Sequence, residues 1–132
     1  MRAILIQGPE LADRDHTVTS LSRDPDPSVL PAGVETVTGD VTDYDSIVGA
    51  FEDVDVVVNL VALSPLMTPD GGNEMHETVH LGGTTNVVEA AQSHWVERIV
   101  QMSGVDADPD GSTHYLRAKG RAEDVVRESG LE

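Results

Sequence analysis

Tyr115 and Lys119 are the two residues whose types and spacing could together perform proton-transfer chemistry. Lys119 is the chain's single lysine, and it follows Tyr115 by four positions. On a helix this spacing places the phenol and the ammonium on one face. Because a nearby cation favours the phenolate form, such a tyrosine can serve as a general acid and base. The pair alone leaves open the alternative of a surface tyrosine beside a solvated lysine.

A second candidate site is the segment from His76 to His80, which matches the pattern H-E-x-x-H of zinc proteases. Two histidines four residues apart on a helix can share a metal ion, and the intervening Glu77 can act as a base. A third ligand would have to be His94 or His114, because no histidine occupies the usual third position. We therefore keep a zinc hydrolase as the weaker alternative and expect no metal.

The elements that must position these residues follow an alternation of short apolar runs with longer amphipathic runs. This alternation is typical of βαβ units around a parallel sheet. We predict one α/β domain over residues 1–132, with a Rossmann-like, doubly wound parallel sheet. The predicted strands cover residues 3–6, 16–21, 34–37, 54–61 and 98–102. The predicted helices cover residues 43–51, 73–93 and 112–129, and the last of these carries the tyrosine–lysine pair.

The composition is strongly acidic. Twenty-four Asp and Glu residues face eight Lys and Arg residues, which gives a formal net charge of −16. Such a field repels nucleic acids and anionic membranes, so we expect neither as a partner. The longest apolar stretch is too short to span a bilayer, and no signal peptide is visible, so a cytoplasmic protein is expected. Near-total loss of lysine in an acidic globular chain resembles the proteins of salt-loving archaea.

The order of these motifs resembles the short-chain dehydrogenase/reductase superfamily. The resemblance is greatest to its atypical and extended branch, which includes nucleotide-sugar epimerases and dehydratases and the accessory subunit of respiratory complex I. Tyr115 and Lys119 match the family's Tyr-x-x-x-Lys, and Ser103 matches the serine that follows the preceding strand. The resemblance implies that Tyr115 is the acid and base, that Ser103 orients it, and that Lys119 tunes it and holds the nicotinamide ribose of the cofactor.

The resemblance also implies a binding site for NADP or NAD. Asp40 and Val41 resemble the acidic–apolar pair that contacts the adenine. Asn59 and Ala62 lie in a segment that resembles the one running along the cofactor. Arg23 resembles the arginine that receives a 2′-phosphate, which favours NADP over NAD. The last assigned cofactor residue is the glycine after the first predicted strand, Gly8.

Several departures from the family pattern argue against full activity. The glycine-rich loop is replaced by Gly8-Pro9-Glu10, in which Pro9 lacks a donor and Glu10 adds negative charge where a pyrophosphate should bind. The connection between the first two strands is too short for the usual crossover helix, so strand one is expected to pair differently or to be held poorly. His80 replaces an asparagine of the active-site helix, and the C-terminal strands and substrate lobe of relatives are absent from this sequence.

These observations together predict an epimerase-like or oxidoreductase-like domain that binds NAD(P) weakly or not at all and is inactive alone. Its ancestral substrate would be a small molecule with a hydroxyl or carbonyl carbon. The second alternative is a non-enzymatic assembly module, in which a second copy covers a sheet face that the missing helix exposes. That alternative predicts a homodimer.

Overall fold

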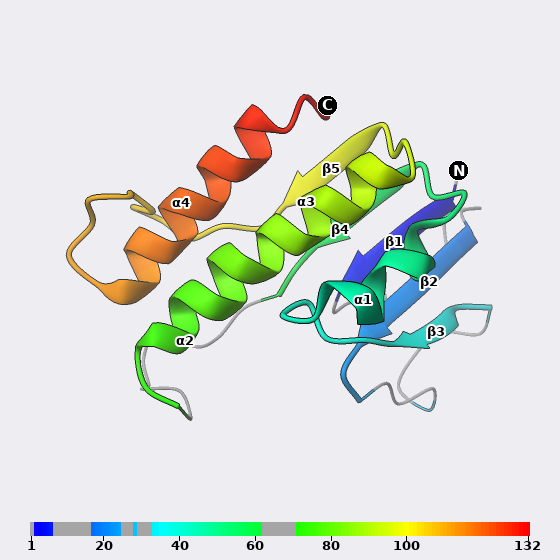
Figure 1. Ribbon diagram of the computed structural model, residues 1–132, viewed down its shortest axis with the longest axis horizontal. Coiled ribbons are helices and arrows are strands. Elements are labelled where there is room, and N and C mark those ends of the chain that lie inside the picture. Colours follow the sequence, from blue (N-terminus) through cyan, green and yellow to red (C-terminus); the bar gives the residue numbers. More distant parts are fainter. Residues whose placement is uncertain (1, 7–16, 25–27, 29–32, 62–70) are drawn as a thin grey trace.

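The computed structural model describes residues 2–6, 17–24, 28, 33–61 and 71–132, with only the backbone described in residues 2–6. Within these ranges the chain forms a five-stranded parallel sheet in the order β3-β2-β1-β4-β5 (Figure 1). In such a sheet the strand order reverses beside the first strand, as in Rossmann-like proteins. The predicted fold class, a Rossmann-like parallel α/β layer, is confirmed.

The strands are short and agree with the predicted ones to within one or two residues at most ends. Their bounds are β1 Arg2–Ile6, β2 Thr17–Ser22, β3 Glu35–Thr38, β4 Val56–Asn59 and β5 Arg98–Gln101. The largest difference is β4, which is half as long as predicted. It is the strand that lies between β1 and β5, and its central Val57 is fully buried.

The helices also lie where the sequence predicted them, with two local differences. Their bounds are α1 Tyr44–Ile47, the 3₁₀ turn η2 Val48–Phe51, α2 Glu74–His76, the π-helical turn η3 Glu77–Gly82, α3 Gly83–Ser93 and α4 His114–Glu128. The first predicted helix tightens into a 3₁₀ turn, and the second contains a π-helical turn. Thr113 caps α4, since its Oγ1 accepts a hydrogen bond from the backbone N–H of Leu116 at 3.1 Å.

One face of the sheet carries the main core. Leu21 of β2, Val57 of β4 and Ile99 of β5 belong to one apolar cluster. Phe51 of η2 and Val87 of α3 pack in the same cluster. Because side chains alternate between the faces of a strand, their neighbours point to the opposite face. The helices of the described residues therefore cover one face, and α3 and α4 run side by side across β4 and β5 (Figure 1).

The opposite face holds a second, smaller cluster, formed by Val18 of β2 and Val56 of β4. Val34 and Val58 pack against it, whereas Val100 at the outer strand β5 is 49% exposed. This face is thus well covered near the centre of the sheet and open towards β5.

The expectation that strand one would pair differently or poorly was wrong. β1 is hydrogen-bonded in parallel with both β2 and β4, and Ile4 is in register with Thr19 and Val57. Residues 7–16, which connect β1 to β2, lie outside the described residues.

Glu132 lies beside the outer edge of β5. Its backbone N–H donates to the Glu97 carbonyl, and its own carbonyl accepts from the Ile99 N–H, both at 3.0 Å. This pair of bonds is the pattern of a parallel ladder. Within the described part of the chain, no helix has both the length and the apolar character that a membrane crossing requires.

Candidate active site

Lys119 lies at the carboxyl ends of β4 and β5, the edge at which open parallel sheets bind their ligands. Its Nζ donates to the carbonyls of Val61 and Met102, at 3.4 and 3.3 Å. The side chain is only 2% exposed. Burial lowers the pKa of its ammonium below the usual lysine range, and the carboxylate of Glu123, one turn further along α4, partly offsets this effect.

Tyr115 lies one helical turn before Lys119, and its phenol rests against the backbone of Gly104. A Cβ atom at position 104 would lie 2.9 Å from the Tyr115 hydroxyl oxygen and 3.0 Å from its Cε1 atom. Ser103 precedes this glycine at the end of β5, and its buried Oγ has no hydrogen-bond partner among the described residues. The structure thus brings the ends of β4 and β5 together with the tyrosine–lysine helix, as the resemblance implied.

Two histidines also contact the ring of Tyr115. The rings of His76 and His80 stack with centroids 5.6 Å apart. Each is edge-on to the ring of Tyr115, at centroid distances of 5.7 and 5.4 Å. Burial, followed by the nearby positive charge of His114, lowers the pKa of His76 below the usual histidine range. No local sequence pattern predicts this contact, because His76 and Tyr115 are almost forty residues apart.

Asn59 is buried and used within the protein. Its Nδ2 donates to Gln101 Oε1 at 3.0 Å and to Thr84 Oγ1 at 3.4 Å, and its Oδ1 accepts from the Val61 N–H at 3.3 Å. Gln101 Nε2 also donates to Thr84 Oγ1, at 3.1 Å. This polar network ties β4, β5 and α3 together beneath the site. Sequence reasoning missed Gln101 and Thr84, since a glutamine and a threonine have no distinctive spacing.

Asp40 and Val41 follow β3 at the same carboxyl edge of the sheet. The Asp40 Oδ1 accepts from the backbone N–H and the hydroxyl of Thr42, at 2.9 and 2.7 Å. The backbone bond is the main reason that the Asp40 pKa lies below its usual range, with smaller contributions from the hydroxyl and from the exposed Arg23, against the effect of burial. Val41 is buried, and its carbonyl accepts from Asn86 Nδ2 at 2.8 Å.

Two predicted cofactor residues, Gly8 and Ala62, lie outside the described residues. A search of the described ranges for three or more His, Asp or Glu side chains that could hold a metal finds no such group. The histidine pair therefore has no third carboxylate or imidazole ligand within that part of the chain.

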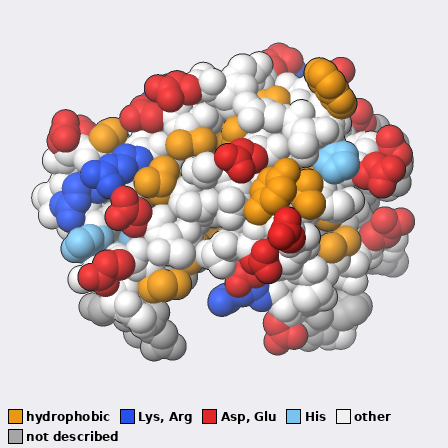
Figure 2. Space-filling view, in the orientation of Figure 1, with side chains coloured by type: hydrophobic (Ala, Val, Ile, Leu, Met, Phe, Trp, Pro, Cys, Tyr) orange, Lys and Arg blue, Asp and Glu red, His pale blue; other side chains and the backbone are white. Residues whose placement is uncertain are grey.

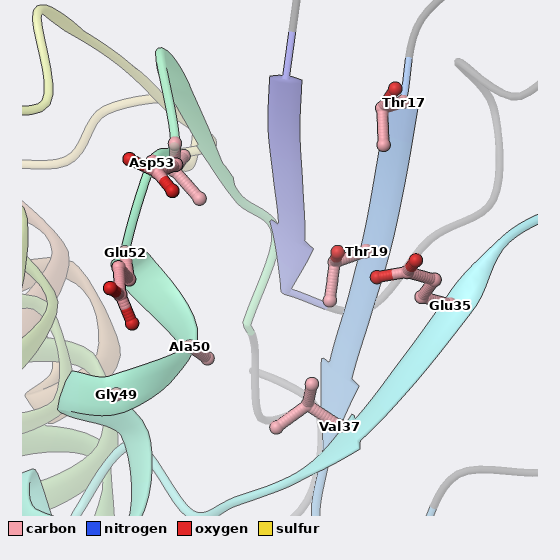
Figure 3. A pocket seen from close by; sticks show the side chains of 9 residues that line it. Thr17, Thr19, Glu35, Val37, Gly49, Ala50, Glu52 and Asp53 are labelled. Atoms are coloured by element: carbon pink, nitrogen blue, oxygen red, sulfur yellow. The ribbon is translucent and has the colours of Figure 1, made fainter.

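A cavity of about 300 Å³ lies elsewhere, between β2, β3 and η2 (Figure 3). Among its lining residues, Thr17 and Glu35 are the first residues of β2 and β3, and Asp53 lies in the turn that precedes β4. Because parallel α/β sheets bind ligands at the carboxyl ends, this cavity is on the wrong edge for the chemistry of Tyr115.

Residues 8–132 of the chain match the family of NAD(P)H-binding proteins. The chain belongs to the NAD(P)H-binding family. It is a Rossmann domain of the short-chain dehydrogenase and epimerase superfamily. This NAD(P)H-binding domain carries its candidate site at the edge that the fold predicts.

Two curated relatives and one solved structure illustrate the match. The domain is 35% identical over 99 residues to the 3β-hydroxysteroid dehydrogenase/Δ5→4-isomerase of Mycobacterium tuberculosis, covering 70% of this chain and 26% of the relative. It is 31% identical over 88 residues to the 40 kDa subunit of mitochondrial NADH-ubiquinone oxidoreductase of Neurospora crassa, covering 67% and 22%. The predicted kinship with the complex I subunit is thus confirmed, and the chain spans about a quarter of the length of these relatives.

The fold comparison includes the Bordetella bronchiseptica enzyme WbmG, solved in complex with NAD. The TM-score is 0.81 at 21% identity, and the match covers 99% of this chain and 50% of the enzyme. At this level of identity the likeness shows the fold alone.

The described residues fit the nicotinamide end of an NAD(P) molecule. Lys119 has three N–H donors and two acceptors among the described residues, which leaves one donor for a ribose hydroxyl. The buried Oγ of Ser103 likewise needs a partner that the described protein groups do not supply. When bound, NAD(P) supplies a hydride acceptor or donor beside these residues.

Proposed function

We propose that this NAD(P)H-binding domain carries the proton-transfer half of an epimerase-like or dehydrogenase-like oxidoreductase. Tyr115 exchanges a proton with a substrate hydroxyl or carbonyl, Ser103 orients that oxygen, and Lys119 holds the nicotinamide ribose. The observation that carries the proposal is the burial of Lys119 between the ends of β4 and β5, one turn from a tyrosine that rests on Gly104. Burying an ammonium is costly, so its retention there favours a chemical role over a structural one.

We further propose that the domain by itself binds NADP or NAD weakly and does not turn over substrate. The sequence Gly8-Pro9-Glu10 offers one donor fewer and one negative charge more than a pyrophosphate site needs. Arg23 is exposed and close enough to influence the charge of Asp40, so it can still attract the 2′-phosphate of NADP. The substrate expected from the chemistry is a small molecule with a secondary alcohol or ketone.

The test is a titration of the purified chain with NADPH and with NADH in molar salt, followed by saturation-transfer NMR of the nicotinamide protons. We expect weak transfer in the wild type, stronger with NADPH than with NADH, and its loss in Lys119→Met. Arg127→Met, which removes an exposed arginine from the same helix, is the matched control and should behave like the wild type. Micromolar affinity would contradict the weak site, and equal signals in the wild type and Lys119→Met would contradict the role of Lys119.

A second candidate function, assembly with another copy of the chain, is supported by the outer part of the sheet. Val100 and Met102 are 49% and 54% exposed on the face that the described helices do not cover. Two apolar side chains at an outer strand are a surface that a second copy can cover. We expect a dimer by light scattering in molar salt that Val100→Asp converts to monomer, and a monomeric wild type would count against this candidate.

A further inference from the structure

Three residues, His76, His80 and Gly104, lie against the side chain of Tyr115, and no sequence motif links these three residues to the tyrosine. The planes of His76 and His80 lie within 14° of each other and are nearly perpendicular to the phenol ring, at 85° and 87°. Edge-to-face pairs at such centroid distances are favourable arrangements of aromatic rings. Gly104 closes the remaining side, since it leaves no space for even a methyl group beside the phenol. The side chain therefore has little freedom to rotate.

The histidine pair is held by a turn of unusual geometry. His80 lies within the π-helical turn η3, and His76 immediately precedes this turn. The turn is braced against α4 by an ion pair between Glu77 Oε1 and Arg121 Nη1 at 2.8 Å. π-Helical turns are rare and are frequently found at functional sites. This one places both imidazoles, 3% and 2% exposed, against the helix that carries Tyr115.

His76 Nδ1 is buried without a hydrogen-bond partner among the described residues. Burial also lowers the pKa of His76, which disfavours the charged form of this ring. This buried imidazole meets the phenol edge-on.

We infer that His76 and His80 are positioning residues for Tyr115. The two stacked imidazole rings hold the phenol in the single orientation that directs its hydroxyl to Gly104 and the end of β5. The inference rests on the proposed role of Tyr115 as acid and base. A fixed phenol meets a substrate oxygen at one distance and angle, and this preorganisation is what a proton-transfer site requires.

The test is NMR of the cofactor-free chain labelled with ¹³C-tyrosine. Only Tyr44 and Tyr115 contribute signals, and Tyr44→Phe assigns them. We expect Tyr115 ring protons to show nuclear Overhauser effects to both imidazoles and shifts displaced from those of free tyrosine. His80→Ala should lose most of this displacement, His80→Phe should retain it, and His94→Ala, at the far end of α3, should leave it unchanged.

Three outcomes would overturn the inference. They are absence of the imidazole contacts in the wild type, unchanged Tyr115 shifts in His80→Ala, and an equal loss of displacement in His80→Phe and His80→Ala. If His80→Ala fails to fold, the wild-type contacts and the His80→Phe variant still decide the matter. Because no cofactor is present, failure of NADPH to bind would remove the proposed function without affecting this measurement.

Discussion

Lys119 and Gly104 are the two residues whose surroundings limit substitution most at the candidate site. Lys119 is an ammonium enclosed by backbone carbonyls, with no carboxylate bonded to it among the described residues. Glycine is the only residue type that fits at position 104, beside the phenol of Tyr115. Each therefore allows a substitution whose effect follows directly from the local physics.

Gly104→Ala should displace the phenol and lower the free energy of unfolding. The added methyl would overlap the Tyr115 hydroxyl, which the histidine pair prevents from moving aside, and overpacking of this kind costs about 1–3 kcal/mol. Urea denaturation measures the loss. Gly49→Ala is the matched control, because its Cβ meets nothing within 4 Å. An equal effect of the two substitutions would contradict the close contact.

Lys119→Met should stabilise the chain near neutral pH by about 1–2 kcal/mol, because it removes a buried charge to which no carboxylate of the described residues is bonded. The folded-state pKa of Lys119 is lowered, so between that pKa and about 10.5 the unfolded chain binds more protons than the folded one. The wild-type free energy of unfolding therefore rises with pH through this window. The advantage of the variant should shrink over the same range, as measured by urea denaturation at several pH values. An advantage independent of pH would contradict burial of the charged form.

At the scale of elements, the loop between β5 and α4 sets the distance from Ser103 to Tyr115. The Asp108 N–H donates to the Leu116 carbonyl at 3.1 Å, and Arg117 Nη1 donates to the Gly111 carbonyl at 2.9 Å. The loop thus packs back onto the helix that follows it. Gly120 of α4 lies directly against the loop backbone at Asp108 and Pro109.

Gly120→Ala should destabilise the chain more than Gly104→Ala does. Its Cβ would lie 2.5 Å from the Pro109 nitrogen, and a backbone segment cannot give way as a side chain can. We expect a loss of about 3 kcal/mol by urea denaturation, at the upper end of overpacking costs. Gly49→Ala again serves as the control. A loss below that of Gly104→Ala would show that the loop is free to move away from α4.

Thr113→Ala should lower the free energy of unfolding by about 1 kcal/mol through loss of the cap of α4. Thr113→Ser retains the hydroxyl and should recover most of the loss in the same urea titration. Equal losses in the two variants would show that the methyl group, and not the cap, is responsible.

The whole molecule is dominated by its negative charge. Asp and Glu side chains are distributed over most of the surface that Figure 2 shows, whereas Lys and Arg side chains occupy only a few places. Since the formal net charge is −16, the folded chain repels itself when the charges are not screened.

Salt should therefore stabilise the chain. Screening acts over about 30 Å at 0.01 M salt and about 3 Å at 1 M, so the unfolding temperature is expected to rise steeply across this range. Thermal unfolding followed by circular dichroism measures it. A variant in which Glu89, Glu97 and Glu128 are replaced by glutamine should be more stable in low salt and show a smaller rise. If the unfolding temperature rises equally in the variant and the wild type, the effect comes from the action of salt on apolar surface and not from charge screening.

The sequence by itself determined the parallel α/β fold, the approximate positions of the strands and helices in the described residues, and the family. The spacing of apolar residues predicts which side chains are buried, and this pattern of burial differs between strands and helices. The expected meeting of Tyr115, Lys119 and the end of β5 was implied by the resemblance to the family and not by the apolar pattern. The catalytic roles of these residues stay predictions.

The tertiary structure alone decided how β1 pairs, which way Asn59 faces and what surrounds Tyr115. The short connection argued against regular pairing of β1, yet both neighbouring strands bond to it. Asn59 satisfies internal partners, and His76 and His80 pack against the tyrosine instead of being joined by a third acidic or histidine ligand among the described residues. These outcomes depend on contacts between residues far apart in the chain, which no local pattern encodes.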